Sequence, residues 1–231
     1  MEQSAVLRAR RNGVADLSVA AIRAKLAALG PSPTLSDIGI SDALVAEAEV
    51  LSAAPGRESW RPSLDATRPA GVLVPLVARA GALNVLLTRR TDHLHHHAGQ
   101  ISFPGGRKEE SDATIEATAL REAREEIGLD ARLVTVLGVL PQYVTLTRFA
   151  ITPVVGLVTP PFDLKPDPFE VADIFEVPLA HLVDPAHHER HFREENGRRR
   201  GFYAIPYGER FIWGATAGIL VNFAALLAGH G

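Results

Sequence analysis

Cysteine is absent from the 231 residues, so disulfide bonds, iron–sulfur clusters, thiolate metal sites and cysteine nucleophiles are excluded. A chain without cysteine suits a reducing compartment, and we expect a cytoplasmic protein. The first residues, 1–4, show no basic segment followed by an apolar one, so no secretory signal is predicted. No apolar run approaches the roughly 20 residues that cross a bilayer, and no membrane partner is expected.

Excess positive charge is absent too. Lys and Arg number 24 against 27 Asp and Glu, which gives a formal net charge of −3. The strongly basic surface of a nucleic-acid-binding protein is therefore not expected. Hydrophobic residues make up 46% and charged residues 22% of the chain. This is the composition of an ordinary folded protein, and at this length it can bury a core without covalent staples.

Two regions of different character follow one another along the chain. Residues 1–70 contain two helical patterns, at 17–29 and 42–53, each ended by a Gly/Pro pair, and we interpret them as a helical arm with a linker that packs on the protein or dimerises. Residues 71–231 alternate between strand and helix patterns, which predicts an α/β sandwich. The predicted strands are 72–77, 84–88, 101–103, 133–139, 148–158 (interrupted at Pro153) and 171–177, with a hairpin at 192–207 and helices at 112–127 and 216–227.

Acidic residues gather in one short stretch. Seven of the 27 acidic residues lie between positions 109 and 126. Glu122, Glu125 and Glu126 are spaced i, i+3, i+4, so they share one face of the predicted helix, where they repel one another unless a cation lies among them. Gly105 and Gly106 precede this helix, and their carbonyls could turn toward such an ion. Hard divalent cations prefer oxygen ligands, so the spacing leaves a metal site and a solvated acidic face as equal alternatives.

The segment Gly106–Leu129 resembles the Nudix box. Its second half, from Arg121 on, matches closely, whereas Asp112 stands where the first Glu of the box is expected, and eight residues rather than seven separate it from Arg121. The preceding segment, Leu86–Gly106, resembles the signature of the coenzyme A diphosphatase branch of the Nudix hydrolases, whose box has the same extra residue. The resemblance covers about residues 70–228. It implies a Nudix-fold α/β/α sandwich with a mixed sheet, beside the N-terminal helical arm.

The activity implied by this resemblance is hydrolysis of the diphosphate bond of coenzyme A or acyl-coenzyme A, which yields 3′,5′-ADP and (acyl-)4′-phosphopantetheine. The implied cofactor is Mg²⁺ or Mn²⁺, since metal ions screen the diphosphate charge and lower the pKa of the attacking water. The implied partner is a small nucleotide substrate. Many members of the family are homodimers, and the sequence leaves the oligomeric state open. It also leaves open the preference for free or acylated coenzyme A.

Motif matching gives the expected metal ligands. Glu122 and Glu126 are the leading ligands, and Glu125 is a further ligand or the general base. The carbonyl of Gly105 or Gly106 adds another ligand, and the same Gly-Gly turn is expected to touch the substrate.

The remaining expected site residues surround these carboxylates. Arg121 is expected to orient the Glu side chains through charge-assisted hydrogen bonds, and Glu170 is the alternative to Glu125 as general base. Arg90 matches the arginine of the branch signature and is expected to contact the substrate. His95 takes the basic position of that signature, in a histidine-rich loop without zinc-ligand spacing. This loop is expected to contact the substrate, with adventitious binding of a transition metal and a plain polar loop as the alternatives.

Departures from the branch pattern keep other functions open. His95 and the Arg148-Phe149 pair both differ from the expected residues, and either could change how the nucleotide is held. One alternative is a Nudix diphosphatase acting on ADP-ribose, a dinucleotide or a nucleoside triphosphate. Another is a non-catalytic ligand-binding regulator with the same fold, against which the intact carboxylate set argues. The basic run 198–200 is expected to be a solvated turn, with contact to the 3′-phosphate as the alternative, and Trp213 a core residue, with a base-stacking platform as the alternative.

Overall fold

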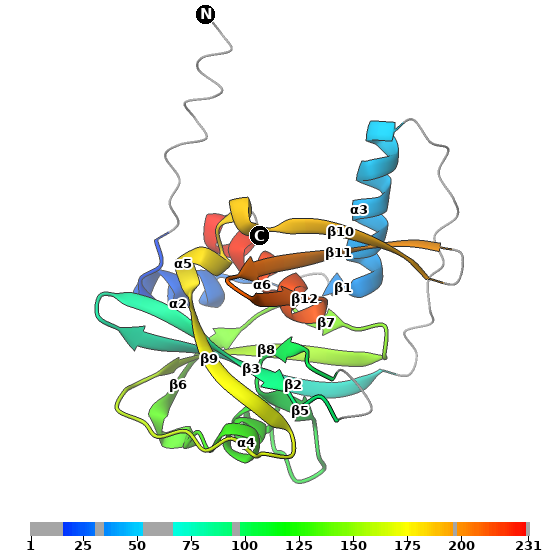
Figure 1. Ribbon diagram of the computed structural model, residues 1–231. Coiled ribbons are helices and arrows are strands. Elements are labelled where there is room, and N and C mark those ends of the chain that lie inside the picture. The colour runs from blue at the N-terminus through cyan, green and yellow to red at the C-terminus, as the bar shows by residue number, and fades with distance from the viewer. Residues whose placement is uncertain (1–15, 31–34, 53–66, 94–97, 196–197, 230–231) are drawn as a thin grey trace, which may run out of the picture.

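A mixed β-sheet forms the centre of the computed structural model, which describes residues 16–30, 35–52, 67–93, 98–195 and 198–229 (Figure 1). Strands β2 and β8 pair in parallel along ten residues at its middle, and the neighbouring strands except β1 join antiparallel. The strands of this sheet are β1 (Leu35–Ser36), β2 (Arg68–Arg79), β3 (Ala82–Arg90), β4 (Ile101–Ser102), β5 (Gly105–Arg107), β6 (Val134–Val139), β7 (Tyr143–Val144), β8 (Phe149–Val158) and β9 (Val171–Pro178).

A second, smaller sheet and five helices complete the described fold. Helix α4 lies against one face of the main sheet, and α2, α6 and the small sheet lie toward the other (Figure 1). The small antiparallel sheet consists of β10 (Glu189–Glu195), β11 (Arg198–Tyr207) and β12 (Arg210–Trp213). The helices are α2 (Val19–Ala27), α3 (Asp37–Ser52), α4 (Ile115–Ile127), α5 (Leu179–Leu182) and α6 (Ala215–Ala228), with 3₁₀ turns at 131–133 and 185–187. The predicted mixed α/β sandwich is confirmed.

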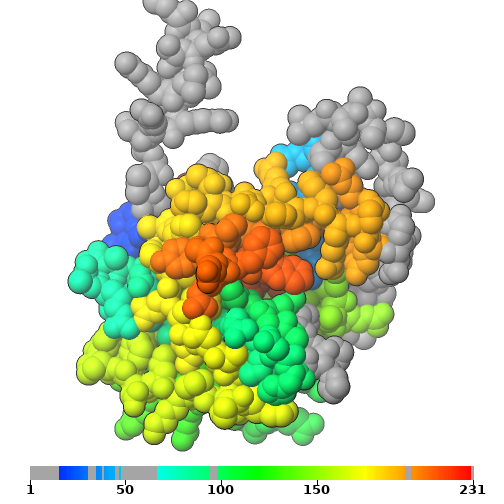
Figure 2. Space-filling view, in the orientation of Figure 1, coloured from blue at the N-terminus to red at the C-terminus, as the bar shows by residue number. Residues whose placement is uncertain are grey.

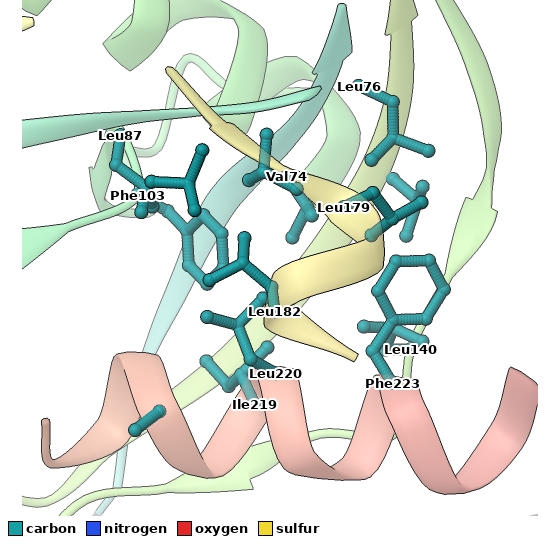
Figure 3. Packing of buried hydrophobic residues seen from close by; sticks show 14 of the residues in the cluster. Val74, Leu76, Leu87, Phe103, Leu140, Leu179, Leu182, Ile219, Leu220 and Phe223 are labelled. Carbon is teal, nitrogen blue, oxygen red and sulfur yellow. The ribbon is translucent and has the colours of Figure 1, made fainter. Parts of the chain in front are cut away.

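Alternation along β2 divides the core into two layers. Val74 and Leu76 point to the side of α6, whereas Leu73 and Val77 point to the side of α4, as the period of two in a strand requires. Figure 3 shows the first layer, where side chains from the sheet, α5 and α6 meet. Each fully buried aliphatic side chain of this kind stabilises the fold by roughly 1.5–3 kcal/mol relative to an exposed one.

The first described helices join this core. Ile22 and Leu26 of α2 are buried, with Ile22 fully inaccessible, and they pack in the same layer as α6. A Cβ on Gly138 of β6 would come within 2.9 Å of the Leu26 Cβ, so this glycine allows α2 to lie close to the sheet. None of the described helices has the length and apolar character needed to cross a membrane.

Several predicted boundaries were wrong, among them the start of the helix predicted at 112–127, which begins at Ile115. The helix expected to begin at Asp42 begins at Asp37, because the Ser36 hydroxyl accepts a hydrogen bond from the Gly39 amide at 2.9 Å and starts the helix earlier. Strand β8 continues through Pro153 without a break. Pro153 falls between the stretch of β8 that pairs with β7 and the stretch that pairs with β6, where its missing N–H leaves no partner unsatisfied.

Candidate functional site

Helix α4 carries the acidic residues, and both of its ends are fixed by local sequence. Thr114 caps the first turn, its hydroxyl accepting from the Ala117 amide at 3.2 Å, and Gly128 ends the helix in the left-handed conformation, at φ 70°. A Cβ on Gly71 of β2 would lie 2.6 Å from the Ile115 carbonyl oxygen, so a glycine there lets the helix pack directly on the sheet.

The Gly105-Gly106 turn lies against two of the carboxylates. The Gly105 amide donates to Glu126 Oε2 at 3.2 Å. A Cβ on Gly106 would fall 2.6 Å from Glu122 Cδ, so the absence of a side chain makes the space that the Glu122 carboxylate occupies. Glu126 is buried and Glu122 half-buried. The predicted turn and the predicted carboxylate face thus meet in one place.

Arg121 connects three carboxylates beside this turn. Its guanidinium donates to both Asp112 oxygens at 3.0 Å, to Glu125 Oε2 at 2.9 Å and to the Arg107 carbonyl at 3.1 Å, and it lies 2.9 Å from Glu122 Oε1. Asp112 also accepts from the Glu109 amide and the Thr118 hydroxyl. The paired Arg121 holds the pKa of Asp112 well below its usual range. Arg121 therefore orients the carboxylates and anchors the loop before α4.

Arg90 and Glu170 lie near the buried Glu126 carboxylate. Arg90 Nη1 lies 3.9 Å from Glu126 Oε1 and 4.0 Å from Glu170 Oε2. Arg90 Nε is buried and has no hydrogen-bond partner within the described part of the chain. The backbone holds this corner together, since the Thr91 amide donates to the Glu170 carbonyl at 3.0 Å. Arg90 is thus loosely paired and faces the carboxylates.

Burial raises the pKa of both inner carboxylates. The pKa of Glu126 rises to about 8, chiefly because burial disfavours its charged form, and the nearby Glu170 charge adds to the effect. The pKa of Glu122 is also raised, chiefly by burial, although Arg121 opposes the shift. A divalent cation between these groups would favour their charged forms and reverse both shifts.

A cavity of about 610 Å³ borders this corner, although Glu122, Glu126 and Glu170 are not among its lining residues. Arg90, Gly105 and Gly106 line its near end. Residues of both the main sheet and the small sheet form its walls. In Figure 2, the orange surface of the small sheet lies above the green surface of residues near 100. Lining residues farther along include Asp37 and Ile40 of α3, Tyr143, Arg200, Phe202 and Trp213. A volume of this size is typical of small-molecule sites.

A comparison with known protein families identifies the domain that contains this corner. The NUDIX domain family model matches residues 67–195, which include the turn, α4 and Glu170. The chain belongs to the Nudix hydrolase family. It is therefore an enzyme of that family, a Nudix diphosphatase, and members of the family typically use divalent metals and nucleotide-derived substrates.

Two curated Nudix relatives and one solved structure illustrate the similarity. A protein of Escherichia coli O1:K1 / APEC called "Uncharacterized Nudix hydrolase NudL" is 39% identical over 157 residues, which are 68% of this chain and 81% of that protein. The protein of the same name from Enterobacter sp. (strain 638) is 38% identical over the same shares. The solved Nudix hydrolase RenU of M. smegmatis is 25% identical over 51% of this chain and 74% of its own, with a TM-score of 0.43.

Elements outside the Nudix match contribute to the cavity. Helix α3 lies before residue 67, and strands β11 and β12 and helix α6 lie after residue 195. They supply Asp37, Arg200 and Trp213 to the cavity wall. Two expectations were thus wrong: Arg200 is not a solvated turn residue, since its side chain is 20% exposed, and Trp213 lines the cavity instead of filling the core.

The structure brings together most of the predicted Nudix site residues. Glu122, Glu126, Gly105, Gly106 and Arg90 meet at one corner, and Arg121 adjoins them. Glu125 lies at the outer side of Arg121 with a 59% exposed side chain. His95 lies outside the described residues. Glu170 lies near Glu126, and this nearness depends on the pairing of β9 with β3, which no local pattern in the sequence reveals.

Proposed function

We propose that this Nudix hydrolase cleaves the diphosphate bond of coenzyme A or an acyl derivative, with Mg²⁺ or Mn²⁺, into 3′,5′-ADP and (acyl-)4′-phosphopantetheine. The supporting observation is the approach of Arg90 to Glu126 at 3.9 Å. Arg90 belongs to the segment that resembles the coenzyme A diphosphatase signature, and Glu126 belongs to the Nudix box. A substrate-reading segment and a carboxylate helix therefore share one corner, and Arg90, Gly105 and Gly106 connect this corner to the cavity wall.

The residues at this corner suit a hard divalent cation. Glu122 and Glu126 offer carboxylate oxygens on the two sides of the Gly105-Gly106 turn, and the missing Cβ of Gly106 leaves room for the Glu122 carboxylate. Among the residues that the structure describes, no three of His, Cys, Asp and Glu form a ready metal cage. A Mg²⁺ site requires fewer protein ligands, since this ion keeps waters and shares substrate phosphates. We therefore assign Glu122 and Glu126 as ligands, with Glu125 and the Gly106 carbonyl as further candidates.

Arg90 and Arg121 complement the metal ion at this corner. Bound Mg²⁺ or Mn²⁺ supplies charge neutralisation on the diphosphate and a lowered pKa for the attacking water. Arg90, with a buried and unpartnered Nε, is placed to donate hydrogen bonds to the diphosphate. Arg121 holds Glu122 and Glu125 in fixed orientations.

The general base is assigned between Glu125 and Glu170. Glu125 Oε2 accepts a hydrogen bond from Arg121 at 2.9 Å, and the Glu125 side chain is 59% exposed. Glu170 Oε2 lies 4.0 Å from Arg90 Nη1, which also approaches Glu126. The Glu170 charge raises the pKa values of both Glu122 and Glu126. Glu170 is thus the better placed residue to take a proton from water bound at this corner.

Product analysis tests the proposal. Purified protein is incubated with coenzyme A, ADP-ribose and a nucleoside triphosphate, each with Mg²⁺ and with Mn²⁺, and products are separated by liquid chromatography. Metal-dependent release of 3′,5′-ADP from coenzyme A, at a kcat/KM at least tenfold above that for the other two, supports it. Preferential cleavage of ADP-ribose or the triphosphate would assign another substrate, and coenzyme A binding without turnover would favour a regulator.

A further inference from the structure

Asp37, which lies outside the residues matched by the Nudix family model, contributes a carboxylate to the far end of the cavity. Asp37 is the first residue of α3 and lines the cavity together with Ile40 of the same helix. Its Oδ1 accepts from the Tyr143 hydroxyl at 2.6 Å, and its Oδ2 accepts from the Leu146 amide at 2.8 Å. A carboxylate has about four acceptor positions, so Asp37 can accept further hydrogen bonds from a molecule in the cavity.

Close packing holds this carboxylate in place. A Cβ on Gly218 of α6 would lie 2.6 Å from the Tyr143 hydroxyl oxygen, so the tyrosine is pressed between α6 and α3. The Gly201 amide of β11 donates to Ser41 Oγ at 3.1 Å, and a Cβ on Gly201 would lie 2.7 Å from the Leu44 Cβ. Helix α3 is therefore fixed against both the sheet and the hairpin, and Asp37 is an ordered part of the cavity wall.

The positive charges near Asp37 are balanced by acidic groups. Arg193 and Arg200 lie directly opposite each other on β10 and β11. Glu195 lies between them, with its Oε2 at 2.6 Å from Arg200 Nε and 3.6 Å from Arg193 Nη2. Among the described residues that line this end, the two arginine charges are therefore balanced by the carboxylates of Glu195 and Asp37. A phosphate dianion placed here would meet the Asp37 carboxylate without surplus positive charge to offset it.

A neutral chain with hydrogen-bond donors suits this end instead. Most of the lining is apolar, with Ile40, Phe149, Ile151, Phe202 and Trp213 among the walls. The near end at Arg90, Gly105 and Gly106 adjoins the carboxylate corner, so a substrate whose diphosphate binds there can extend into the cavity. Of the two halves of coenzyme A, the nucleotide half carries an additional 3′-phosphate, whereas the pantetheine half is uncharged and carries two amides and a hydroxyl.

We propose that the cavity binds the pantetheine arm of the substrate and that Asp37 is a specificity-determining residue, which accepts a hydrogen bond from an amide N–H or hydroxyl of that arm. This inference rests on the proposed function, since it names the place of one half of coenzyme A. It gives α3, which lies outside the Nudix match, a role in substrate choice. Asp37 acts at a distance from the diphosphate and takes no part in bond cleavage.

The test compares the two product halves as ligands. Calorimetry with Mg²⁺ measures the Kd values of 4′-phosphopantetheine and 3′,5′-ADP for the wild type, Asp37→Asn and Asp42→Asn. Asp42 is the matched control, because it lies on the same helix and does not line the cavity. We expect Asp37→Asn to weaken 4′-phosphopantetheine about tenfold, as for the loss of one charge-assisted hydrogen bond. The Kd of 3′,5′-ADP stays within twofold, and Asp42→Asn matches the wild type.

Three outcomes would overturn the inference: weakened 3′,5′-ADP with unchanged 4′-phosphopantetheine, equal weakening of both ligands, or no change in either. Should Asp37→Asn fail to fold, Ile40→Phe serves as the second variant, since it narrows the same cavity. It is expected to weaken 4′-phosphopantetheine selectively, and unchanged binding would count against the inference. Wild-type turnover of coenzyme A, measured in parallel, reports on the proposed function separately, because the binding comparison requires no catalysis.

Discussion

Glu126→Gln separates the catalytic role of this residue from its effect on stability. The substitution keeps the shape of a side chain that is 6% exposed and that accepts from the Gly105 amide at 3.2 Å. It removes the charge assigned to the metal. We expect kcat to fall at least about a hundredfold, equivalent to about 2.7 kcal/mol, by analogy with deletion of one strong electrostatic group in an active site.

The same substitution should increase the stability of the metal-free protein at neutral pH. The pKa of Glu126 rises from 4.5 to about 8 in the fold, so at pH 7 the folded protein holds a proton that the unfolded chain has released. At about 1.4 kcal/mol per pH unit, this costs the metal-free wild type about 3 kcal/mol at pH 7. The cost is absent below pH 4.5 and is complete above pH 8. The free energy of unfolding of the wild type therefore decreases across this window, whereas that of Glu126→Gln does not.

Urea unfolding in the presence of a chelator, at pH 4.5, 6 and 8, measures this difference. Glu116→Gln, on the same helix, is the matched control and is expected to follow the wild type within a few tenths of a kcal/mol. The wild type and Glu126→Gln should converge at pH 4.5 and diverge toward pH 8. Parallel curves for the two proteins, or a variant with near-normal turnover, would refute the reasoning about Glu126.

Other predictions concern the turn, the core and the anchoring pair. Gly106→Ala brings a Cβ to 2.6 Å from Glu122 Cδ, and steady-state kinetics should show a loss of kcat of at least about tenfold in a protein with an unchanged circular dichroism spectrum. Ile22→Ala should lower the free energy of unfolding by about 2–4 kcal/mol in urea titration, because Ile22 is fully buried; a change under 1 kcal/mol would show that α2 adds little. Arg121 depresses the pKa of Asp112, so this pair contributes stability at neutral pH that is lost as the pH falls below about 4. Asp112→Asn should be less stable than the wild type at pH 7, with thermal melts converging at low pH, and a constant gap would argue against the pair.

Sequence patterns predicted the elements whose determinants are local. The helix predicted at 112–127 was recognisable because Gly128 ends it and the acidic triplet defines one face, although it begins at Ile115, after the Thr114 cap. Its meeting with the Gly105-Gly106 turn was also predictable, since both lie within one continuous motif. The approach of Arg90 to Glu126 depended on a resemblance, because the two residues lie on different elements.

Long-range contacts explain what was missed. The position of Asp37 in the cavity depends on Tyr143, more than one hundred residues away along the chain. Arg200 reads as a solvated turn residue because no neighbour in the sequence reveals that β11 faces α3 and the main sheet. Such contacts arise from the packing of elements distant in the chain, and periodicity within one element carries no signal for them.

The most direct test of the central claim is mass-spectrometric analysis of coenzyme A incubated with the wild type and with Glu126→Gln, with Mg²⁺ and with a chelator. The account predicts equal amounts of 3′,5′-ADP and 4′-phosphopantetheine from the wild type with Mg²⁺, and at least a hundredfold less from the variant or with the chelator. Intact coenzyme A after incubation of the wild type with Mg²⁺ or Mn²⁺, or equal product from the variant, would contradict it.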